Sequence, residues 1–313
     1  MASPVRTRSA SRPVTWMAVP ALLGLLLPLQ RAWLPGQGSI GWALDLFAHW
    51  QPLYCVLWLF ACLWGARRDG RWLLGLPLLA LPWITASPRA PHSDAPPDLV
   101  VAVANVNIRQ RDPEALLAWL QRAPANVVVL TELSPDYATA LAAKKYGGFA
   151  HRALHPLASP PGLGVLSDRP LRNVRVLPDG LGALRMEADI DIDGRTAHFV
   201  VAHPKPPMAT RKFIARDRLL RELAAGATTR PTIVAGDLNS TPWSSALLGA
   251  EPHALRRATG GAPTYPSEGR GLFGIGIDHV LVSPGFDRTG AERGPDIGSD
   301  HLPIRAGVRW RGE

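Results

Sequence analysis

Acidic, amide and imidazole side chains stand at the points where short apolar runs of this sequence end. Asn105 and Asn107 close one such run, and Glu132 follows the next. The other residues of this kind are His203, Asp237, Asn239, Asp278, Asp300 and His301. A polar group at the end of a buried strand is costly unless it is paired or bound to a metal ion. Six such strand ends therefore indicate one shared site at the edge of a sheet.

The residue types in this set restrict the chemistry that the site could perform. Carboxylate and amide oxygens are hard ligands, which suit Mg²⁺ or Mn²⁺. The sequence has no His-x-x-x-His or thiolate arrangement of the kind that binds structural zinc. A divalent ion would neutralise phosphate oxygens and the leaving oxygen. A separate carboxylate could then orient a water molecule, and histidines could take part in acid–base chemistry.

The sequence from residue 99 onward predicts the strands and helices that would position these side chains. Residues 99–106 and 126–130 are apolar runs typical of buried strands, and residues 112–122 begin with helix N-terminal signals. A second helix is expected over residues 209–225. Further strands are expected over residues 163–167, 171–177, 181–190, 196–202, 232–235, 277–282 and 303–310. Strand pairs mixed with helices favour a layered α/β sandwich over a barrel.

The order of these polar residues resembles that of the endonuclease/exonuclease/phosphatase superfamily (deoxyribonuclease I-like). The resemblance covers about residues 99–310, and its most specific parts are Gly236-Asp237-Leu238-Asn239 and Ser299-Asp300-His301. It implies an α/β sandwich of two mixed sheets flanked by helices. The Pro-rich run after His203 and the apolar N-terminal region resemble a membrane-anchored bacterial branch of this family, which implies a lipid-linked phosphate substrate.

On the metal side of the site, the resemblance implies roles for three residues. Glu132 would be the principal ligand of a Mg²⁺ or Mn²⁺ ion, and Asp300 would assist it. Asn107 stands where many relatives have a second acid that helps to hold the metal. An amide in place of a carboxylate reduces the negative charge available to the ion.

On the phosphate side, the resemblance implies that Asp237 orients or deprotonates the attacking water. His301, paired with Asp278, would bind the phosphoryl group, and His203 would contact the scissile phosphate or protonate the leaving group. The two remaining residues would contact phosphate or water, namely Asn105 and Asn239. His279 alternates away from Asp278 on a strand, so we expect it to be structural.

Residues 1–86 differ from the rest of the chain because they contain three apolar stretches, at residues 14–30, 52–66 and 72–86. They also contain eight of the 11 tryptophans, as an aromatic belt at a membrane interface would require. A spanning helix needs about 20 apolar residues. The pattern predicts about three transmembrane helices, with two spans or a hairpin as the alternative. A cleaved signal peptide would explain only the first stretch.

Basic residues predict the orientation of this membrane anchor. Three arginines precede the first apolar stretch and three lie between the second and the third, whereas the other two flanks have one each. The positive-inside rule places the arginine-rich flanks in the cytoplasm. With three spans, the C-terminal domain lies outside the cytoplasmic (plasma) membrane.

The sequence thus divides into a membrane anchor (1–86), a short Pro-rich linker (87–97) and a catalytic domain (98–313). Of the net charge of +9, the domain carries only +4, which does not indicate an extended basic groove for nucleic acid. We therefore expect hydrolysis of a phosphoester or pyrophosphate in a lipid-linked or membrane-proximal substrate. The alternatives are an extracellular metal-dependent nuclease and a non-catalytic binding module, and the latter would be expected to have lost Glu132, Asp237 or His301.

Overall fold

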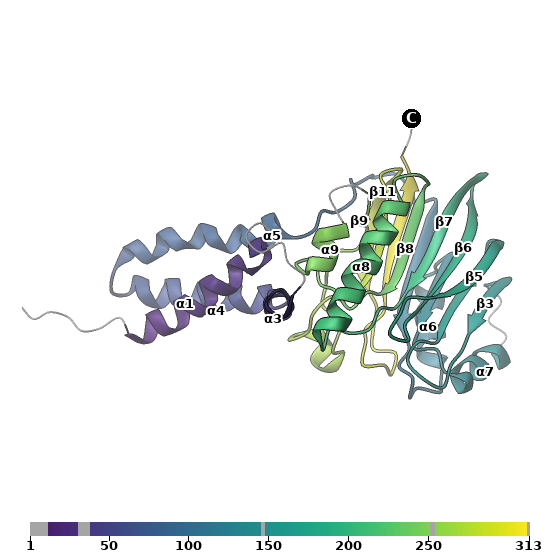
Figure 1. The fold of residues 1–313 in the computed structure, drawn as a ribbon, viewed down its shortest axis with the longest axis horizontal. Coiled ribbons are helices and arrows are strands. Elements are labelled where there is room, and N and C mark those ends of the chain that lie inside the picture. Colours follow the sequence, from purple (N-terminus) through teal and green to yellow (C-terminus); the bar gives the residue numbers. More distant parts are fainter. Residues whose placement is uncertain (1–11, 31–37, 145–147, 251–253, 312–313) are drawn as a thin grey trace, which may run out of the picture. The chain divides into compact units, whose positions relative to one another are not determined.

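The computed structural model describes residues 12–30, 38–144, 148–250 and 254–311. The chain divides into two compact units, Met1–Ala86 and Ser87–Glu313. The first unit is helical (Figure 1), and its elements are α1 (Arg12–Leu26), η1 (Leu27–Leu29), α3 (Ser39–Ala48), α4 (Gln51–Ala66), η2 (Gly70–Ala80) and α5 (Leu81–Thr85). Its small core is formed around Leu25, Ala61 and Cys62, none of which is exposed.

The structure does not support the expectation of three spanning helices. Among the described residues, no single helix is both long and apolar enough to cross a membrane. Helices α3 and α4 meet that criterion only as a pair, and their axes are bent by 66° at the break. Prolines explain why the α-helices of this unit are shorter than the predicted spans. Pro28 lies in the 3-10 turn after α1, and Pro77 lies in the 3-10 helix η2. Proline removes a backbone donor and disfavours a continuous α-helix.

The second unit contains two six-stranded mixed sheets. The first has the order β11 (Phe286–Arg293), β12 (Ile304–Trp310), β1 (Leu99–Asn105), β2 (Val127–Thr131), β4 (Leu163–Ser167) and β3 (His151–His155). The second has the order β5 (Leu171–Pro178), β6 (Leu184–Ile192), β7 (Arg195–Ala202), β8 (Thr232–Asp237), β10 (Asp278–Val282) and β9 (Arg256–Arg257). Strands β1 and β2 are parallel, as are β7 and β8, and the other pairs are antiparallel.

The layers of the second unit follow the order helix–sheet–sheet–helix (Figure 1). Successive side chains of the central strands point alternately to the core between the sheets and to the core beneath the helices. In β1, Val101 and Val103 belong to the core between the sheets, whereas Ala102 and Ala104 face the core beneath the outer helices. Both faces of these strands are buried, which is why they read as continuous apolar runs. Helices α6 (Glu114–Arg122) and α7 (Pro135–Ala143) cover this sheet, and α8 (Thr210–Gly226) and α9 (Ser245–Ala250) cover the other. The prediction of an α/β sandwich of two mixed sheets is confirmed.

The parallel pairs direct their carboxyl ends to the same end of the sandwich. Strands β1 and β2 finish there at Asn105 and Thr131, and β7 and β8 finish there at Ala202 and Asp237. The two sheets meet at this end, because the side chain of Asn105 donates a hydrogen bond of 3.1 Å to Asp237. We call it the polar end of the sandwich.

Residues 87–97, expected as a linker, are instead bound along one side of the second unit, and we call them the strap. Arg89 forms a parallel bridge with Arg257 in β9, and His92 forms another with Arg288 in β11. Ala90 is only 3% exposed and belongs to the core between the sheets. Strands β9 and β11 are edges of the two sheets, and the strap satisfies their free backbone groups. The segment is therefore not a free tether.

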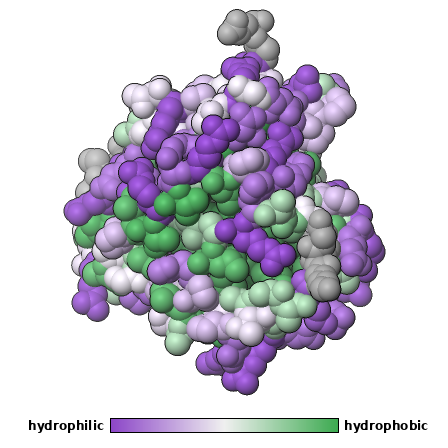
Figure 2. Space-filling model, turned by 90° about the vertical axis from the view of Figure 1, so that its right-hand side faces the viewer, coloured by the Kyte–Doolittle hydropathy of each residue, from purple (hydrophilic) through white to green (hydrophobic). Residues whose placement is uncertain are grey.

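The opposite edges, β3 and β5, have no such covering among the described residues. Figure 2 views the molecule from this side and shows hydrophobic residues reaching the surface in the middle of the face, surrounded by hydrophilic ones. Ala153 in β3 and Leu171 in β5 are only partly buried, although they pack against the core between the sheets. The strap therefore protects one open side of the sandwich and leaves the other uncovered.

Candidate active site

The polar residues singled out in the sequence converge at the polar end. Asn105 ends β1, Asp237 ends β8, and Asp278 begins β10. The register of β8 and β10 makes Asp237 and Asp278 direct neighbours across the antiparallel pair. His301 lies in the segment before β12 and reaches the same point from the other sheet. One site thus receives side chains from both sheets.

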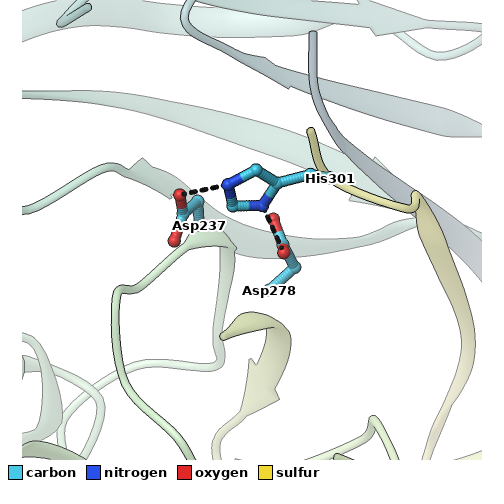
Figure 3. Close-up of side chains that lie close together, drawn as sticks. All are labelled: Asp237, Asp278 and His301. Atoms are coloured by element: carbon cyan, nitrogen blue, oxygen red, sulfur yellow. Dashed lines mark hydrogen bonds and ion pairs between the residues drawn. The ribbon is translucent and has the colours of Figure 1, made fainter. Parts of the chain in front are cut away.

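A histidine between two carboxylates forms the centre of the site (Figure 3). The Nδ1 atom of His301 lies 2.9 Å from Oδ2 of Asp278, and its Nε2 atom lies 3.7 Å from Oδ2 of Asp237. All three side chains are buried. Burial alone would lower the pKa of His301, but the charges of Asp278 and Asp237 outweigh it and raise the pKa to about 10. His301 is therefore an imidazolium ion at neutral pH.

Asp237 is surrounded by groups that direct its carboxylate. Its Oδ1 atom accepts a hydrogen bond of 2.9 Å from the backbone N–H of Asn239, and its Oδ2 atom accepts the bond from Asn105. The Nε2 atom of His203 lies 3.6 Å from the same Oδ2 atom. Burial raises the pKa of Asp237, and the charge of His301 opposes that rise. A carboxylate with a raised pKa is a better proton acceptor than an exposed one.

The backbone of the site is held in sparsely populated conformations. Asn107, Glu132 and Asn239 have φ values of 57°, 57° and 48°, in the left-handed region that non-glycine residues rarely adopt. Gly236, next to Asp237, has a φ of 148°, and a Cβ atom there would lie 2.1 Å from the carbonyl oxygen of Ala202. Such conformations cost energy and are typical of functional sites.

A second group of oxygen atoms lies beside this centre. Glu132 accepts hydrogen bonds of 3.1 Å from Asn105 and from the backbone N–H of Ile108. Asn107 donates a hydrogen bond of 2.9 Å to Oδ1 of Asp300. Glu132, Asn107 and Asp300 are all half-buried. Each oxygen of a carboxylate has two lone pairs, so Glu132 can accept a further ligand beside its hydrogen bonds.

The distances define one place for a divalent cation, and a second set of oxygen atoms is a candidate for another. Atoms of Asp237, Asp278 and His301 lie within 4.8 Å of one another and are the one such group of three among the described residues. Both ring nitrogens of His301 face carboxylates, so a metal ion in this group would have to displace a proton from the ring. The oxygens of Glu132, Asn107 and Asp300 carry two negative charges and are the hard ligands that Mg²⁺ prefers.

His203 and Asn239 occupy the side of the site formed by the segment after β7. His203 is buried, and its Nδ1 atom has no hydrogen-bond partner among the described residues. A buried polar atom without a partner is unusual and is explained when a ligand supplies one. The amide of Asn239 donates a hydrogen bond of 3.0 Å to the carbonyl of Pro204, so it fixes this segment beside Asp237.

The structure places His279 away from the site, as expected. It is fully buried, and its ring nitrogens lie 3.0 Å from Oγ1 of Thr259 and 2.8 Å from the carbonyl oxygen of Ser240. Burial, aided by the charge of Arg257, lowers the pKa of His279 to about 4, so its imidazole is neutral. It joins the segment after β8 to the segment before β10.

Sequence reasoning missed two residues of the site. The Tyr265 ring lies 4.8 Å from the His301 ring at an angle of 42°. Ser299 donates to the carbonyl oxygen of Asn105 at 2.7 Å and accepts from the N–H of His301 at 3.1 Å. Ser299 was part of a recognised motif, so its type could have indicated a supporting role. Tyr265 lies in an irregular segment, and no sequence pattern marks it.

Comparisons with known proteins agree with this geometry. A sequence model described as "Endonuclease/Exonuclease/phosphatase family" matches residues 102–301. No curated protein matches the sequence. An endonuclease/exonuclease/phosphatase from Beutenbergia cavernae superposes with a TM-score of 0.55 and 20% identity, over 68% of this chain and 72% of that chain.

Two similar structures are of proteins with more specific titles. A humanised TDP2 of D. rerio has a TM-score of 0.57 and 15% identity, over 67% of this chain and 98% of that chain. The 3′ phosphatase NExo from Neisseria, bound to a product DNA hairpin, has a TM-score of 0.52 and 19% identity, over 68% of this chain and 100% of that chain. At these identities the likeness shows the fold alone.

Proposed function

Because this chain belongs to the endonuclease/exonuclease/phosphatase family, we propose that it is a metal-dependent phosphoesterase whose active site is the polar end of the second unit. The observation that carries this proposal is the position of Asp237. It is a buried carboxylate within 3.1–3.7 Å of Asn105, His203 and His301. These neighbours hold a proton acceptor next to a fixed positive charge, as hydrolysis of a phosphoester requires.

Glu132, Asp300 and Asn107 are the residues that would hold the metal ion. When bound, Mg²⁺ or Mn²⁺ neutralises charge on the phosphate and on the leaving oxygen. Their placement beside Asp237 is fixed by Asn105, whose amide donates to both Glu132 and Asp237. Asn105 thus connects the metal side of the site with the phosphate side.

The remaining residues act on the water and the phosphate. Oδ2 of Asp237 accepts a proton from the attacking water while the new P–O bond forms and the ester P–O bond breaks. The imidazolium of His301, held by Asp278, donates from Nε2 to a phosphoryl oxygen and stabilises its charge. His203, which has a ring nitrogen without a partner, contacts the scissile phosphate or protonates the leaving oxygen.

We further propose that the first unit anchors the enzyme in the cytoplasmic membrane, with the second unit outside and a lipid-linked phosphate or pyrophosphate as substrate. Eighteen of the 24 exposed large hydrophobic side chains of the described residues lie in the first unit, which supports burial of its surface in lipid. The arginine-rich flanks support the orientation. The strap supports a membrane-proximal site, because its bonds to β9 and β11 shorten the free connection between the anchor and the second unit.

The test is a substrate comparison with the full-length protein in liposomes. We expect hydrolysis of a polyprenyl pyrophosphate or a phospholipid, read as released phosphate or headgroup, at a higher rate than cleavage of duplex DNA. A nuclease is the second candidate, because the structure of NExo contains a product DNA hairpin. Efficient DNA degradation with no product from any lipid would favour the nuclease.

The orientation has its own test in intact bacteria. A C-terminal alkaline phosphatase fusion should be active, and a C-terminal green fluorescent protein fusion should be dark, because the C-terminus is expected outside the membrane. A bright fluorescent fusion with an inactive phosphatase fusion would place the second unit in the cytoplasm.

A further inference from the structure

Most of the large hydrophobic side chains that are exposed in the described part of the second unit lie in segments at the polar end. Six such residues are exposed in this unit, and five lie in segments at the polar end: Leu181, Met208, Tyr265, Leu272 and Phe273. The sixth is Val174, on β5. Scattered exposed hydrophobic residues are normal, but two adjacent and strongly exposed ones beside an active site indicate a binding surface.

The most exposed pair lies in the segment between β9 and β10. Leu272 and Phe273 are 75% and 84% exposed, against 41% for Val174. We call residues 264–276 the hairpin, because Tyr265 and Ile275 form an antiparallel bridge at its base. Leu272 and Phe273 follow each other on the arm that leads to Ile275, and we call these two exposed residues the apolar pair.

The hairpin is attached to the residues on both sides of His301. The N–H of Ser267 donates to the carbonyl oxygen of Asp300 at 2.8 Å, and Oγ of Ser267 donates to the carbonyl oxygen of Ser299 at 2.7 Å. The N–H of Leu302 donates to the carbonyl oxygen of Thr264 at 2.8 Å. The position of the hairpin is therefore coupled to the position of His301.

Close backbone contacts also fix the base of the hairpin. A Cβ atom on Gly274 would lie 2.7 Å from the carbonyl oxygen of Tyr265, and one on Gly276 would lie 2.6 Å from that of Ala262. These glycines let the two arms approach closely, and Tyr265, whose ring contacts His301, lies on one arm. The apolar pair therefore belongs to an arm that is held by close backbone contacts.

Two arginines lie beside the apolar pair. Arg270 is exposed two residues before Leu272, and a Cβ atom on Gly271 would lie 3.0 Å from a guanidinium nitrogen of the exposed Arg293. Apolar side chains bordered by cations suit the boundary between acyl chains and anionic headgroups. The first residue of the second unit, Ser87, donates its N–H to the carbonyl oxygen of Pro242, three residues after Asn239. The chain thus enters this unit beside a segment of the active site.

We propose that the hairpin is a lipid-docking element that inserts Leu272 and Phe273 into a bilayer containing anionic lipid and so presents His301 and Asp237 to headgroups. This inference rests on the proposed function and names the surface on which that function is performed.

The first test reads docking directly, without activity. A polarity-sensitive fluorophore is placed on Leu272→Cys in the full chain, with Cys55 and Cys62 replaced by alanine, and Val174→Cys is the matched control. In vesicles of phosphatidylcholine and phosphatidylglycerol, we expect a blue shift and quenching by nitroxide lipids at position 272 only. A label at position 272 that remains as water-exposed as the control would overturn the proposal. A shift caused by a single-stranded oligonucleotide and not by vesicles would also overturn it.

The second test separates docking from chemistry. The double variant Leu272→Ser/Phe273→Ser should lower kcat/KM on a lipid substrate in vesicles by at least about ten-fold, because two large apolar side chains no longer enter the bilayer. Its turnover of a soluble phosphoester in detergent should stay within about two-fold of wild type, as expected for an exposed substitution. Equal losses on both substrates would overturn docking. If wild type hydrolyses no phosphoester, the proposed function fails, and the fluorescence result still decides docking.

Discussion

The two halves of the active site differ in how their charges are satisfied. In the buried half, Asp237 and Asp278 share the positive charge of His301. In the open half, the hydrogen bonds to Glu132 and Asp300 come from amide and hydroxyl donors, and only Asp300 also feels the charge of His301. A divalent cation between these two carboxylates would balance their remaining charge. The buried half thus contains a cation of its own, whereas we expect the open half to take one from solution.

The strongest expected effect is in the buried half. Asp237→Asn should lower kcat by about 10³-fold, within the range for a positioned acid–base group, because the amide cannot accept the proton of water. It should leave the metal-induced rise in Tm in place, since the open half is intact. Steady-state kinetics and thermal melts measure both quantities, and Asp136→Asn, at an exposed site, is the control. Near-wild-type turnover would remove Asp237 from the catalytic residues.

The open half should respond in the opposite way. Glu132→Gln should lower turnover by about 10²-fold at a fixed Mg²⁺ concentration and abolish most of the metal-induced rise in Tm. The Tm of the metal-free protein should change little, because the amide keeps a hydrogen-bond acceptor for Asn105. Glu114→Gln, on the exposed start of α6, is the control. An unchanged metal response would place the ion elsewhere, with the buried group as the alternative.

His203 should show a smaller effect that depends on the leaving group. His203→Asn should lower turnover by about ten-fold, below the range of Asp237, because the residue assists without accepting the water proton. If it protonates the leaving oxygen, an alkyl phosphate should lose more activity than a p-nitrophenyl phosphate, whose leaving group needs no proton. Equal losses on the two substrates would assign His203 to binding of the scissile phosphate instead.

The smallest effect is expected where the open half has an amide. Asn107→Asp should tighten Mg²⁺ binding by about ten-fold, because a carboxylate adds charge to the site. It should also lower the Tm of the metal-free protein, since Asn107 now donates to Asp300 and the new carboxylate would repel it. Asp tolerates the left-handed backbone of this position. A Mg²⁺ titration followed by thermal melts would show both effects, and weaker binding would exclude residue 107 from the metal side.

The central strands could be predicted from the sequence more fully than the edges. Strands β1 and β8 are buried on both faces and read as apolar runs, so their ends indicated the site. Edge strand β5 was predicted, but β3 and β11 were missed, because they are mostly half-buried or exposed and have no continuous apolar run. The strap was mistaken for a linker, because its bonds to β9 and β11 join residues far apart in the sequence.

The residues of the site could be predicted from the sequence, but their pairing with one another could not. Residue types and strand ends indicated which side chains take part. The direct pairing of Asp237 with Asp278 follows from the register of β8 and β10, which are separated in sequence by a long segment that includes α9 and β9. The contact of Tyr265 with His301 also joins residues far apart in the sequence, and Tyr265 lies in a hairpin that has no apolar pattern. Such contacts are decided by tertiary packing, which local patterns do not encode.

The most direct measurement of the central claim is the metal dependence of phosphoester hydrolysis by the full-length protein. We predict turnover that disappears in excess chelator, returns with Mg²⁺ or Mn²⁺, and does not return in Glu132→Gln at the same metal concentration. This result would show that the open half binds the ion that the reaction requires. Full turnover in excess chelator, or equal metal rescue of wild type and Glu132→Gln, would contradict the account.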